Sequence, residues 1–437
     1  MIKAGFSRVE VTPPLGTYMS GYFAHRYAKG IMDPLYLNAI ALSDGENTAL
    51  IITADFLGIR DVYATPIRTK IAEKVGINAD NIIITCLHQH TSICLRDDPG
   101  GANNVLNDHT YLNVLYRKFC DVAMMATNDM SEATLGLAEM QALEQLSFIR
   151  RFRMKDGSTK TNASRNPDML GPIGQPDNTV RLLRFVREGK GDIAMVNFST
   201  HPDTVGGSLF CPDWPGYTRR YVEADHEGVS CIVVNGAQGD SNHVHYTEES
   251  KGKGGPHAKY MARVITDTVN MLWDKTEECK VDKVSSSVEY VYQITRTDGA
   301  EHYDDCAEKY PLVQEKLIDA KCLDYVGGAG GARRIVQMRF APLFQKIAVS
   351  VISLGKINFV GFGGEPFTHY ATAVREALPE KHIVALCCAN GYEGYLPTKE
   401  AYSEGGYEAV TSPFHPSLED DCVNLAVEII NKLNLEE

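Results

Sequence analysis

The sequence has no excess of positive charge, no long apolar run and no Cys-x-x-Cys pair, and each shortage excludes a class of protein. Its 437 residues carry 43 lysines and arginines against 56 aspartates and glutamates, a formal net charge of −13. This balance argues against a nucleic-acid partner, which requires a basic face, and offers no attraction to an anionic membrane. No apolar run approaches the roughly 20 residues of a transmembrane helix, so we expect no membrane span.

The cysteines also exclude a disulfide framework. There are eleven of them, an odd number, and they are scattered along the chain. We therefore expect reduced, mostly buried thiols and a cytoplasmic location. The opening segment, MIKAGFSRVEV, is too polar for a signal peptide and is typical of a strand.

What the chain does contain is a recurring unit: a buried strand, a glycine-containing elbow with polar residues, and then a helix. With 44% apolar residues there is ample material for a core. The unit predicts an α/β fold of layered mixed sheets flanked by helices, with a metal site at the carboxyl ends of the strands. Clear examples are strands at Ile193–Phe198 and Asn358–Phe362 and a closing helix at Leu418–Leu433. Residues 155–177 are expected to form a long surface loop, and Pro212–Gly216 to break the chain before a helix.

The stretch Asn81–His90, NIIITCLHQH, organises the functional argument. Its isoleucine run predicts a buried strand that ends in two histidines, His88 and His90. Residues two apart in an extended segment lie on one face, so both imidazoles can turn towards one point. Imidazole is a common zinc ligand. The alternative is two polar residues at a strand end, hydrogen-bonded or solvated.

Further strand ends carry candidate chemistry: His201, the segment Asn235–Asn242, Glu365 and Tyr395. Two histidines and one carboxylate are a common zinc hydrolase set that leaves a position open for water. Each member has a structural alternative, such as a satisfied loop histidine at 201 or a helix-start acid at 365. Parallel strands would bring all of these residues to one edge of the sheet. This common position favours a shared site over separate structural roles for each residue.

These segments resemble, in order along nearly the whole chain, the neutral (alkaline, non-lysosomal) ceramidases. That family consists of zinc-dependent amidases that cleave the N-acyl bond of ceramide. The resemblance rests on an opening Gly5-Phe6-Ser7 with Val11-Thr12-Pro13-Pro14, on Leu87-His88-Gln89-His90-Thr91-Ser92, on Ser199-Thr200-His201-Pro202, on Asn235-Gly236-Ala237-Gln238-Gly239-Asp240, on Gly363-Gly364-Glu365-Pro366-Phe367 and on Asn390-Gly391-Tyr392-Glu393-Gly394-Tyr395 with Tyr402 and Tyr407.

The resemblance implies a role for each matching residue. His88, His201, Glu365 and Tyr395 would hold one zinc ion, and His90 would act beside it as an acid or base. Arg150, or its neighbour Arg151, and Tyr407 would steady the acyl carbonyl and its oxyanion. We also expect Asp240 to orient one of the site histidines.

The chain departs from the family in three ways. Asn242 stands where the family's proposed catalytic serine is expected, with Ser241 one place early, and a one-residue shift turns a side chain to the other face of an extended segment. The family's C-terminal β-sandwich domain and its export signal are not expected here. We therefore predict a single ceramidase-like catalytic domain over residues 1–437.

The predicted function is a zinc-dependent hydrolase that cleaves an amide bond of a small-molecule or lipid-like acyl substrate by metal-activated water. Two alternatives stay open: hydrolysis of a small polar ester or lactone, and a protein that binds zinc and a ligand without turnover. A second His-x-His pair, His243 and His245, is expected to face solvent without a metal role. The sequence leaves the oligomeric state open, a homo-oligomer included.

Overall fold

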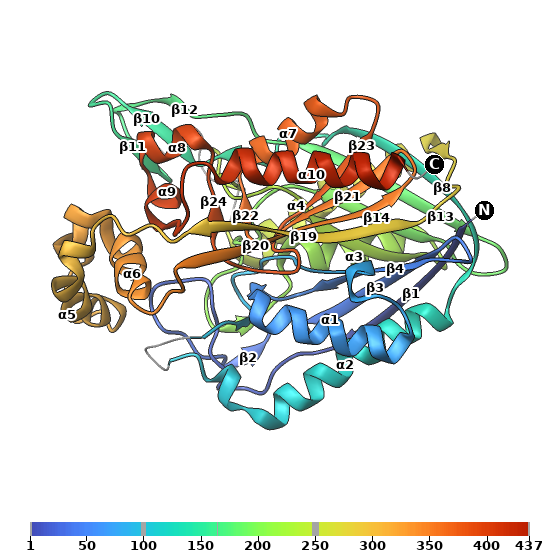
Figure 1. Ribbon diagram of the computed structural model, residues 1–437, viewed down its shortest axis with the longest axis horizontal. Helices are drawn as coiled ribbons and strands as arrows, with labels where there is room; N and C mark the ends of the chain where they lie inside the picture. Colours follow the sequence, from blue (N-terminus) through green and yellow to red (C-terminus); the bar gives the residue numbers. More distant parts are fainter. Residues whose placement is uncertain (1, 98–101, 164, 247–252, 436–437) are drawn as a thin grey trace.

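The computed structural model describes residues 2–97, 102–163, 165–246 and 253–435. In the described chain, nine strands form one large mixed sheet (Figure 1). Its path runs through β16 (Ser230–Asn235), β14 (Ile193–Phe198), β13 (Thr179–Arg187), β8 (Ser131–Gln141), β1 (Ile2–Glu10), β3 (Tyr36–Ser43), β4 (Thr48–Ala54) and β6 (Ile82–Cys86), with β18 (Glu277–Cys279) paired to β8. The end strand β16 also contacts β3 and β4, so the sheet curves back on itself.

A second sheet has the order β19 (Ser285–Ile294), β20 (Phe344–Leu354), β21 (Ile357–Phe362) and β23 (His382–Leu386). Three pairs in the two sheets are parallel: β4 with β6, β14 with β16, and β21 with β23. The other pairs are antiparallel, so the predicted mixed character of the sheets is confirmed. The three parallel pairs matter for function, because the polar loops follow their carboxyl ends.

The two sheets pack against each other, and helices cover their outer faces (Figure 1). The interface between the sheets is a core of aliphatic side chains such as Ile83, Ile352 and Phe359. Helices α1 (Asp61–Val75) and α2 (His109–Asn128) cover one part of the large sheet, and α3 (Asp213–Asp225) and α4 (Gly254–Leu272) cover another. Helices α7 (Thr368–Ala377) and α10 (Leu418–Leu435) cover the second sheet. This order of helix, sheet, sheet and helix layers buries central strands such as β4, β6, β14 and β21 along nearly their whole length.

Local sequence explains these elements. Strand β6 is buried on both faces, and its isoleucine run suits that position. Helix α2 buries Leu112, Leu115, Phe119 and Val122, which recur at three- and four-residue spacing along one face. No described helix combines the length and the apolar composition that a bilayer crossing requires. All eleven cysteines are free thiols, and most of them are buried.

Two sequence predictions for loops were wrong. Residues 155–177 contain β11 (Thr159–Thr161) and β12 (Met169–Pro172), which flank β10 (Arg151–Met154) in a small antiparallel sheet. The two strands are only three and four residues long, too short for an alternation that would have indicated them. Helix α3 begins at Asp213, so Pro212–Gly216 does not break the chain. Pro215 lies in the first helical turn, where the missing N–H loses no helical hydrogen bond.

Short elements complete the loops at the carboxyl ends of the strands. Pairs of two-residue strands join distant loops, as in β22 with β24 and β17 with β9. These and the remaining elements are β2 (Gly30–Ile31), β5 (Gly58–Ile59), β7 (Cys94–Leu95), β9 (Phe148–Ile149), β15 (Leu209–Phe210), β17 (Ser241–Asn242), β22 (Glu365–Pro366), β24 (Tyr395–Leu396), α8 (Lys399–Glu404) and α9 (Tyr407–Thr411), with single 3₁₀ turns η1 (Ala79–Asn81), η2 (Asn104–Asn107), η3 (Trp273–Lys275) and η4 (Ala300–His302).

Residues 303–338, inserted between β19 and β20, form what we call the end module. It contains α5 (Tyr303–Gln314), η5 (Ala320–Val326) and α6 (Gly328–Met338), and it projects from one end of the sandwich, at the left of Figure 1. It has a small core of its own, built around Cys306, Leu323 and Ile335. Glycines at the start of α6 let that helix lie against α9: a Cβ on Gly330 would be 2.5 Å from Thr411 Cγ2. The glycine run therefore opens a helix.

Candidate active site

The polar residues that follow the parallel strand pairs meet at one place. His88 follows β6, His201 follows β14, and Glu365 follows β21. Glu365 opens β22, whose parallel pairing with β24 sets it beside Tyr395. The loops are tied together across the two sheets, since Thr85 Oγ1 donates to Cys387 O at 2.6 Å. The structure therefore brings these four predicted residues to one end of the sandwich.

Several nitrogen and oxygen atoms that could bind a cation lie close together here without hydrogen-bond partners among the described residues. Glu365 Oε2 lies 3.2 Å from His88 Nε2 and 3.2 Å from His201 Nε2. One ligand atom from each of His88, His90 and His201 lies within 4.8 Å of the others, and all three residues are buried. Among the described residues, His201 Nε2, Glu365 Oε2 and both ring nitrogens of His90 have no hydrogen-bond partner. Buried polar atoms without partners are costly, and a cation among these nitrogen and oxygen donors would satisfy them.

His88 and His201 are oriented by main-chain carbonyls. His88 Nδ1 lies 2.8 Å from Leu57 O, and His201 Nδ1 lies 2.9 Å from both Gln238 O and Ser241 O. A proton on Nδ1 is held by these carbonyls, which leaves the Nε2 lone pair directed into the cluster. His88 also adopts a φ of 72°, a left-handed conformation held by its N–H bond to Phe56 O at 3.0 Å. Strained backbone of this kind is typical of functional sites.

The expectation that Asp240 orients a site histidine is wrong. Its Oδ1 accepts hydrogen bonds from Thr368 N at 2.9 Å and Thr368 Oγ1 at 2.8 Å. Those bonds cap α7, whose own N-cap residue, Phe367, makes no side-chain cap. Burial raises the pKa of the Asp240 carboxyl, and the hydrogen bonds from Thr368 oppose that shift. The backbone carbonyls took the role that the sequence assigned to this aspartate.

His90 is flanked by a carboxylate that the sequence reasoning missed. Asp203 Oδ1 lies 3.6 Å from His90 Nδ1, and it also accepts the hydroxyl of Tyr22. Burial holds the pKa of His90 well below its usual value, and the nearby His88 adds to this effect. Asp203 stands two residues after His201, and this position in the same loop could have indicated it as a site residue. No sequence feature indicated Tyr22.

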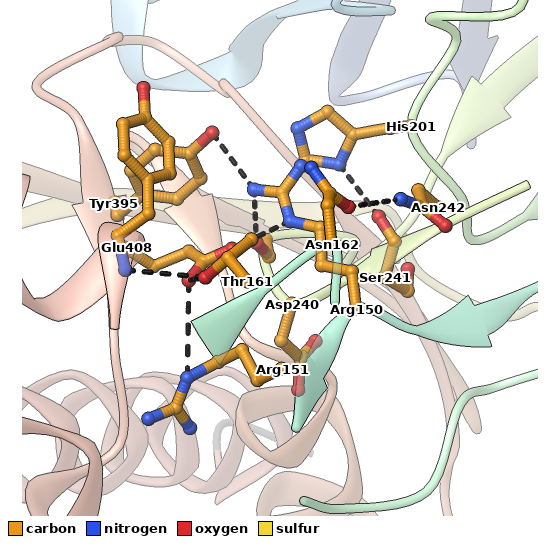
Figure 2. Close-up of polar contacts among 12 residues, drawn as sticks. Arg150, Arg151, Thr161, Asn162, His201, Asp240, Ser241, Asn242, Tyr395 and Glu408 are labelled. Atoms are coloured by element: carbon orange, nitrogen blue, oxygen red, sulfur yellow. Dashed lines mark hydrogen bonds and ion pairs between the residues drawn. The ribbon is translucent and has the colours of Figure 1, made fainter. Parts of the chain in front are cut away.

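Arg150 lies beside the cluster, and Arg151 points away from it (Figure 2). Arg150 Nη2 donates to Tyr395 Oη and to Gly239 O, each at 2.9 Å. Its Nε donates to Glu408 Oε1 at 2.7 Å, and Glu408 is fully buried. Arg151 pairs with Glu404 at 3.1 Å and lies 3.9 Å from the other oxygen of Glu408. Of the two arginines named from the sequence, Arg150 is the one beside the cluster, and Glu408, which no motif indicated, supports it.

The Ser241 hydroxyl does not face the site. Ser241 is fully buried, and its Oγ lies 3.4 Å from Gln238 O. Asn242 Nδ2 donates to Asn162 Oδ1 at 2.8 Å, so the amide, not the hydroxyl, borders the site (Figure 2). This agrees with the expected effect of the one-residue shift.

The second His-x-His pair does not face solvent as expected. Both His243 and His245 are half-buried. The His243 ring lies 5.2 Å from the His257 ring, and the His245 ring lies 4.9 Å from Phe148. Burial, together with the nearby His257, lowers the pKa of His243 to about 4.

A cavity of about 590 Å³ opens above the cluster. We call its base, formed by His88, His90, Glu365, Arg150 and Tyr395, the cavity floor. Tyr22, Phe23, Tyr392 and Tyr407 line the sides, and α6 of the end module supplies Arg333, Arg334 and Gln337. This size suits a small organic ligand.

No protein-family model and no curated protein matches this chain. Solved structures do match it. Neutral ceramidase from Pseudomonas aeruginosa superposes with a TM-score of 0.74 at 16% sequence identity, covering 100% of this chain and 75% of that one. A ceramidase complexed with C2 superposes with the same TM-score at 15% identity and the same coverage. At such low identity the similarity is one of fold, and the chain therefore has a neutral ceramidase-like fold.

Proposed function

We propose that this protein is a zinc-dependent hydrolase that cleaves an amide (N-acyl) bond. The observation that carries the proposal is the convergence of unsatisfied donors on the cavity floor, where Glu365 Oε2 lies 3.2 Å from a nitrogen of each of two histidines. The ceramidase-like fold supports the same reaction class. We assign the whole chain, residues 1–437, to one catalytic domain.

His88, His201, Glu365 and Tyr395 would hold one ion, as the donor set fits zinc. When bound, zinc supplies a Lewis acid that polarises an acyl carbonyl and lowers the pKa of a water to about 7. In the hydrolysis the acyl C–N bond breaks, the water oxygen becomes part of the acid product, and a proton passes to the amine.

His90 is the residue placed to move that proton. Its buried ring is held neutral, since burial keeps its pKa low, and neither ring nitrogen is hydrogen-bonded to a described residue. A neutral imidazole can accept a proton from water and return it to the leaving nitrogen. Asp203, 3.6 Å from Nδ1, would stabilise the charged ring while it carries the proton.

Arg150 and Tyr407 would stabilise negative charge on the acyl oxygen. Arg150 is fixed by Glu408 and Tyr395 through Nε and Nη2, which leaves Nη1 for a substrate. Tyr407 lies across from Tyr395, with ring centroids 5.6 Å apart, and lines the cavity. A positioned donor of this kind typically contributes about 3–4 kcal/mol to the transition state.

The test combines elemental analysis with an assay that a chelator controls. We expect about one zinc per chain and turnover of N-acyl amides that chelation abolishes and added zinc restores. A panel should contain a short N-acyl sphingoid amide, small polar amides, esters and lactones. Absence of any bound divalent metal, or turnover that survives complete metal removal, would refute the proposal.

A further inference from the structure

We propose that the cavity takes substrates that carry an anionic group, of which a carboxylate is the simplest, and that Arg333 of the end module binds this group. The inference rests on the proposed function and adds the substrate class. It comes from the cations of the cavity, because two of them form no ion pair with a carboxylate in the described part of the chain.

Five arginines line the cavity, and three are paired. Arg60 Nε donates to Glu393 at 2.9 Å, Arg150 Nε to Glu408 at 2.7 Å, and Arg334 Nη2 to Asp298 at 3.1 Å. The remaining two, Arg96 and Arg333, make no ion pair with any residue that the structure describes. The chain as a whole has an excess of acidic residues, with a net charge of −13, so two unpaired arginines in one cavity are unexpected.

The acidic groups of the cavity are already engaged. Asp97 accepts the Tyr63 hydroxyl at 2.6 Å, Asp203 accepts the Tyr22 hydroxyl and lies near His90, and Glu393 pairs with Arg60. Glu365 lies on the cavity floor between two histidines. No lining carboxylate is therefore free to neutralise Arg333 or Arg96, and an anionic ligand could do so.

The surroundings of Arg333 are aromatic. Its guanidinium carbon lies 5.6 Å from the centre of the Phe23 ring, and the Phe23 ring centre lies 5.9 Å from that of Tyr407. Tyr407 in turn lies 5.6 Å from Tyr395 on the cavity floor. A half-buried cation among aromatic rings has lost part of its hydration, so a carboxylate that pairs with it gains more than at an open surface.

This chain of contacts also orders the site. Arg333 lies over Phe23, Phe23 contacts Tyr407, and Tyr407 contacts Tyr395, so the anion would bind beside this row of aromatic rings. Helix α6 is fixed there by close packing, since a Cβ on Gly330 would be 2.8 Å from Tyr407 Cε2. A substrate would place its acyl carbon on the floor and its carboxylate at Arg333, on either the amine or the acyl half.

The experiment uses the zinc-loaded full chain and matched substrates. One arm contains N-acetyl derivatives of glycine, β-alanine and 4-aminobutyrate, each as free carboxylate and as carboxamide. The other contains monoamides of dicarboxylic acids and their methyl esters. We expect the best carboxylate to exceed its neutral partner in kcat/KM by roughly 10- to 100-fold, the usual contribution of a charge-assisted hydrogen bond. A long-chain neutral amide preferred over every carboxylate would overturn the inference.

Variants locate the effect. Arg333→Gln should collapse the ratio of carboxylate to carboxamide turnover, and Arg333→Lys should restore part of it. Arg339→Gln is the matched control, because Arg339 ends the same helix, stacks on Tyr303 and does not line the cavity. A preference that survives in R333Q would overturn the assignment.

Binding without turnover separates this inference from the proposed function. Ketomethylene isosteres of all three N-acetyl carboxylates are made whether or not any is turned over, and the tightest binder should bind R333Q at least about tenfold more weakly than the parent protein by calorimetry, while its carboxamide form should bind both alike. Equal binding of the carboxylate to both proteins refutes the inference, even where amide turnover and zinc are present. If no substrate is turned over, the proposed function fails and the isostere still decides the role of Arg333.

Discussion

The cavity floor and the end module differ in what supports their polar groups. On the floor, main-chain carbonyls at strand ends hold the histidines, as Leu57 O holds His88 at 2.8 Å and Gln238 O holds His201 at 2.9 Å. In the end module, Arg333 makes no ion pair with a described residue and lies over the Phe23 ring, and large apolar side chains such as Leu317 remain exposed. The floor is built into two packed sheets, and the end module is attached at their edge.

This difference indicates that the two regions have different tasks, chemistry on the floor and substrate selection in the end module. Groups that perform chemistry need positions accurate to a fraction of an ångström, which strand ends inside a packed core supply. Groups that select a substrate can lie on an inserted segment, where changes leave the core intact. The two regions should therefore respond differently to mutation, and the following predictions are ordered by expected effect.

The largest effect is expected on the floor itself. His88→Ala or Glu365→Ala removes a ligand, so bound zinc should fall to near zero and kcat/KM by more than about 1000-fold, since even outer partners of ligands typically contribute about 10–100-fold. Elemental analysis and the amide assay measure both. His382→Ala, at an exposed histidine, is the control. A ligand variant with full activity and no metal would contradict the mechanism.

The next effect concerns the support of Arg150. Glu408→Gln leaves the Arg150 guanidinium buried without its carboxylate, which should lower the free energy of unfolding by about 3–5 kcal/mol. Urea unfolding measures it. Glu404→Gln is matched, because that glutamate pairs with Arg151 at 3.1 Å but is half-buried, and it should cost no more than about 1 kcal/mol. Similar losses in the two variants would show that the floor has no special dependence on this pair.

A substitution at the contact between the two regions should alter binding and spare the metal. Gly330→Ala places a Cβ 2.5 Å from Thr411 Cγ2, so α6 must move away from Tyr407. We expect KM to rise by roughly tenfold, because small displacements of positioning groups are costly, with zinc content unchanged. Gly171→Ala, which meets open space, is the control. Loss of zinc in G330A would show that the end module also holds the floor together.

The smallest effect is a pH dependence near the floor. Burial lowers the pKa of His243 to about 4, while an unfolded histidine has a pKa of about 6.5. The unfolded state binds more protons between these values, so this contribution to stability is complete above pH 6.5 and is lost as the pH falls towards 4. In His243→Gln the unfolding free energy should decline less steeply over that window. An unchanged slope would mean that His243 titrates normally in the folded protein.

Much of the framework was predictable because it rests on local patterns. Strand Ile193–Phe198 was predicted with its observed bounds, and the closing helix begins at Leu418 as its periodicity indicated. The strands in 155–177 were missed because they are short, and the start of helix α3 because its prolines lie where a first turn tolerates them. Each miss concerns an element whose stability comes from its neighbours.

The donor types that follow the buried strands could be read from local sequence, since His88, His201 and Glu365 stand directly after apolar runs whose burial brings strand ends together. The partners of the polar side chains depended on long-range packing. Arg150 meets Glu408 across 258 positions of sequence, and Asp240 caps a helix that begins 128 positions later. Strand periodicity is a property of neighbouring residues, whereas a hydrogen bond between distant loops depends on how whole layers pack. For that reason the donors could be found in the sequence, and the placement of Asp240, Arg150 and Arg333 could not.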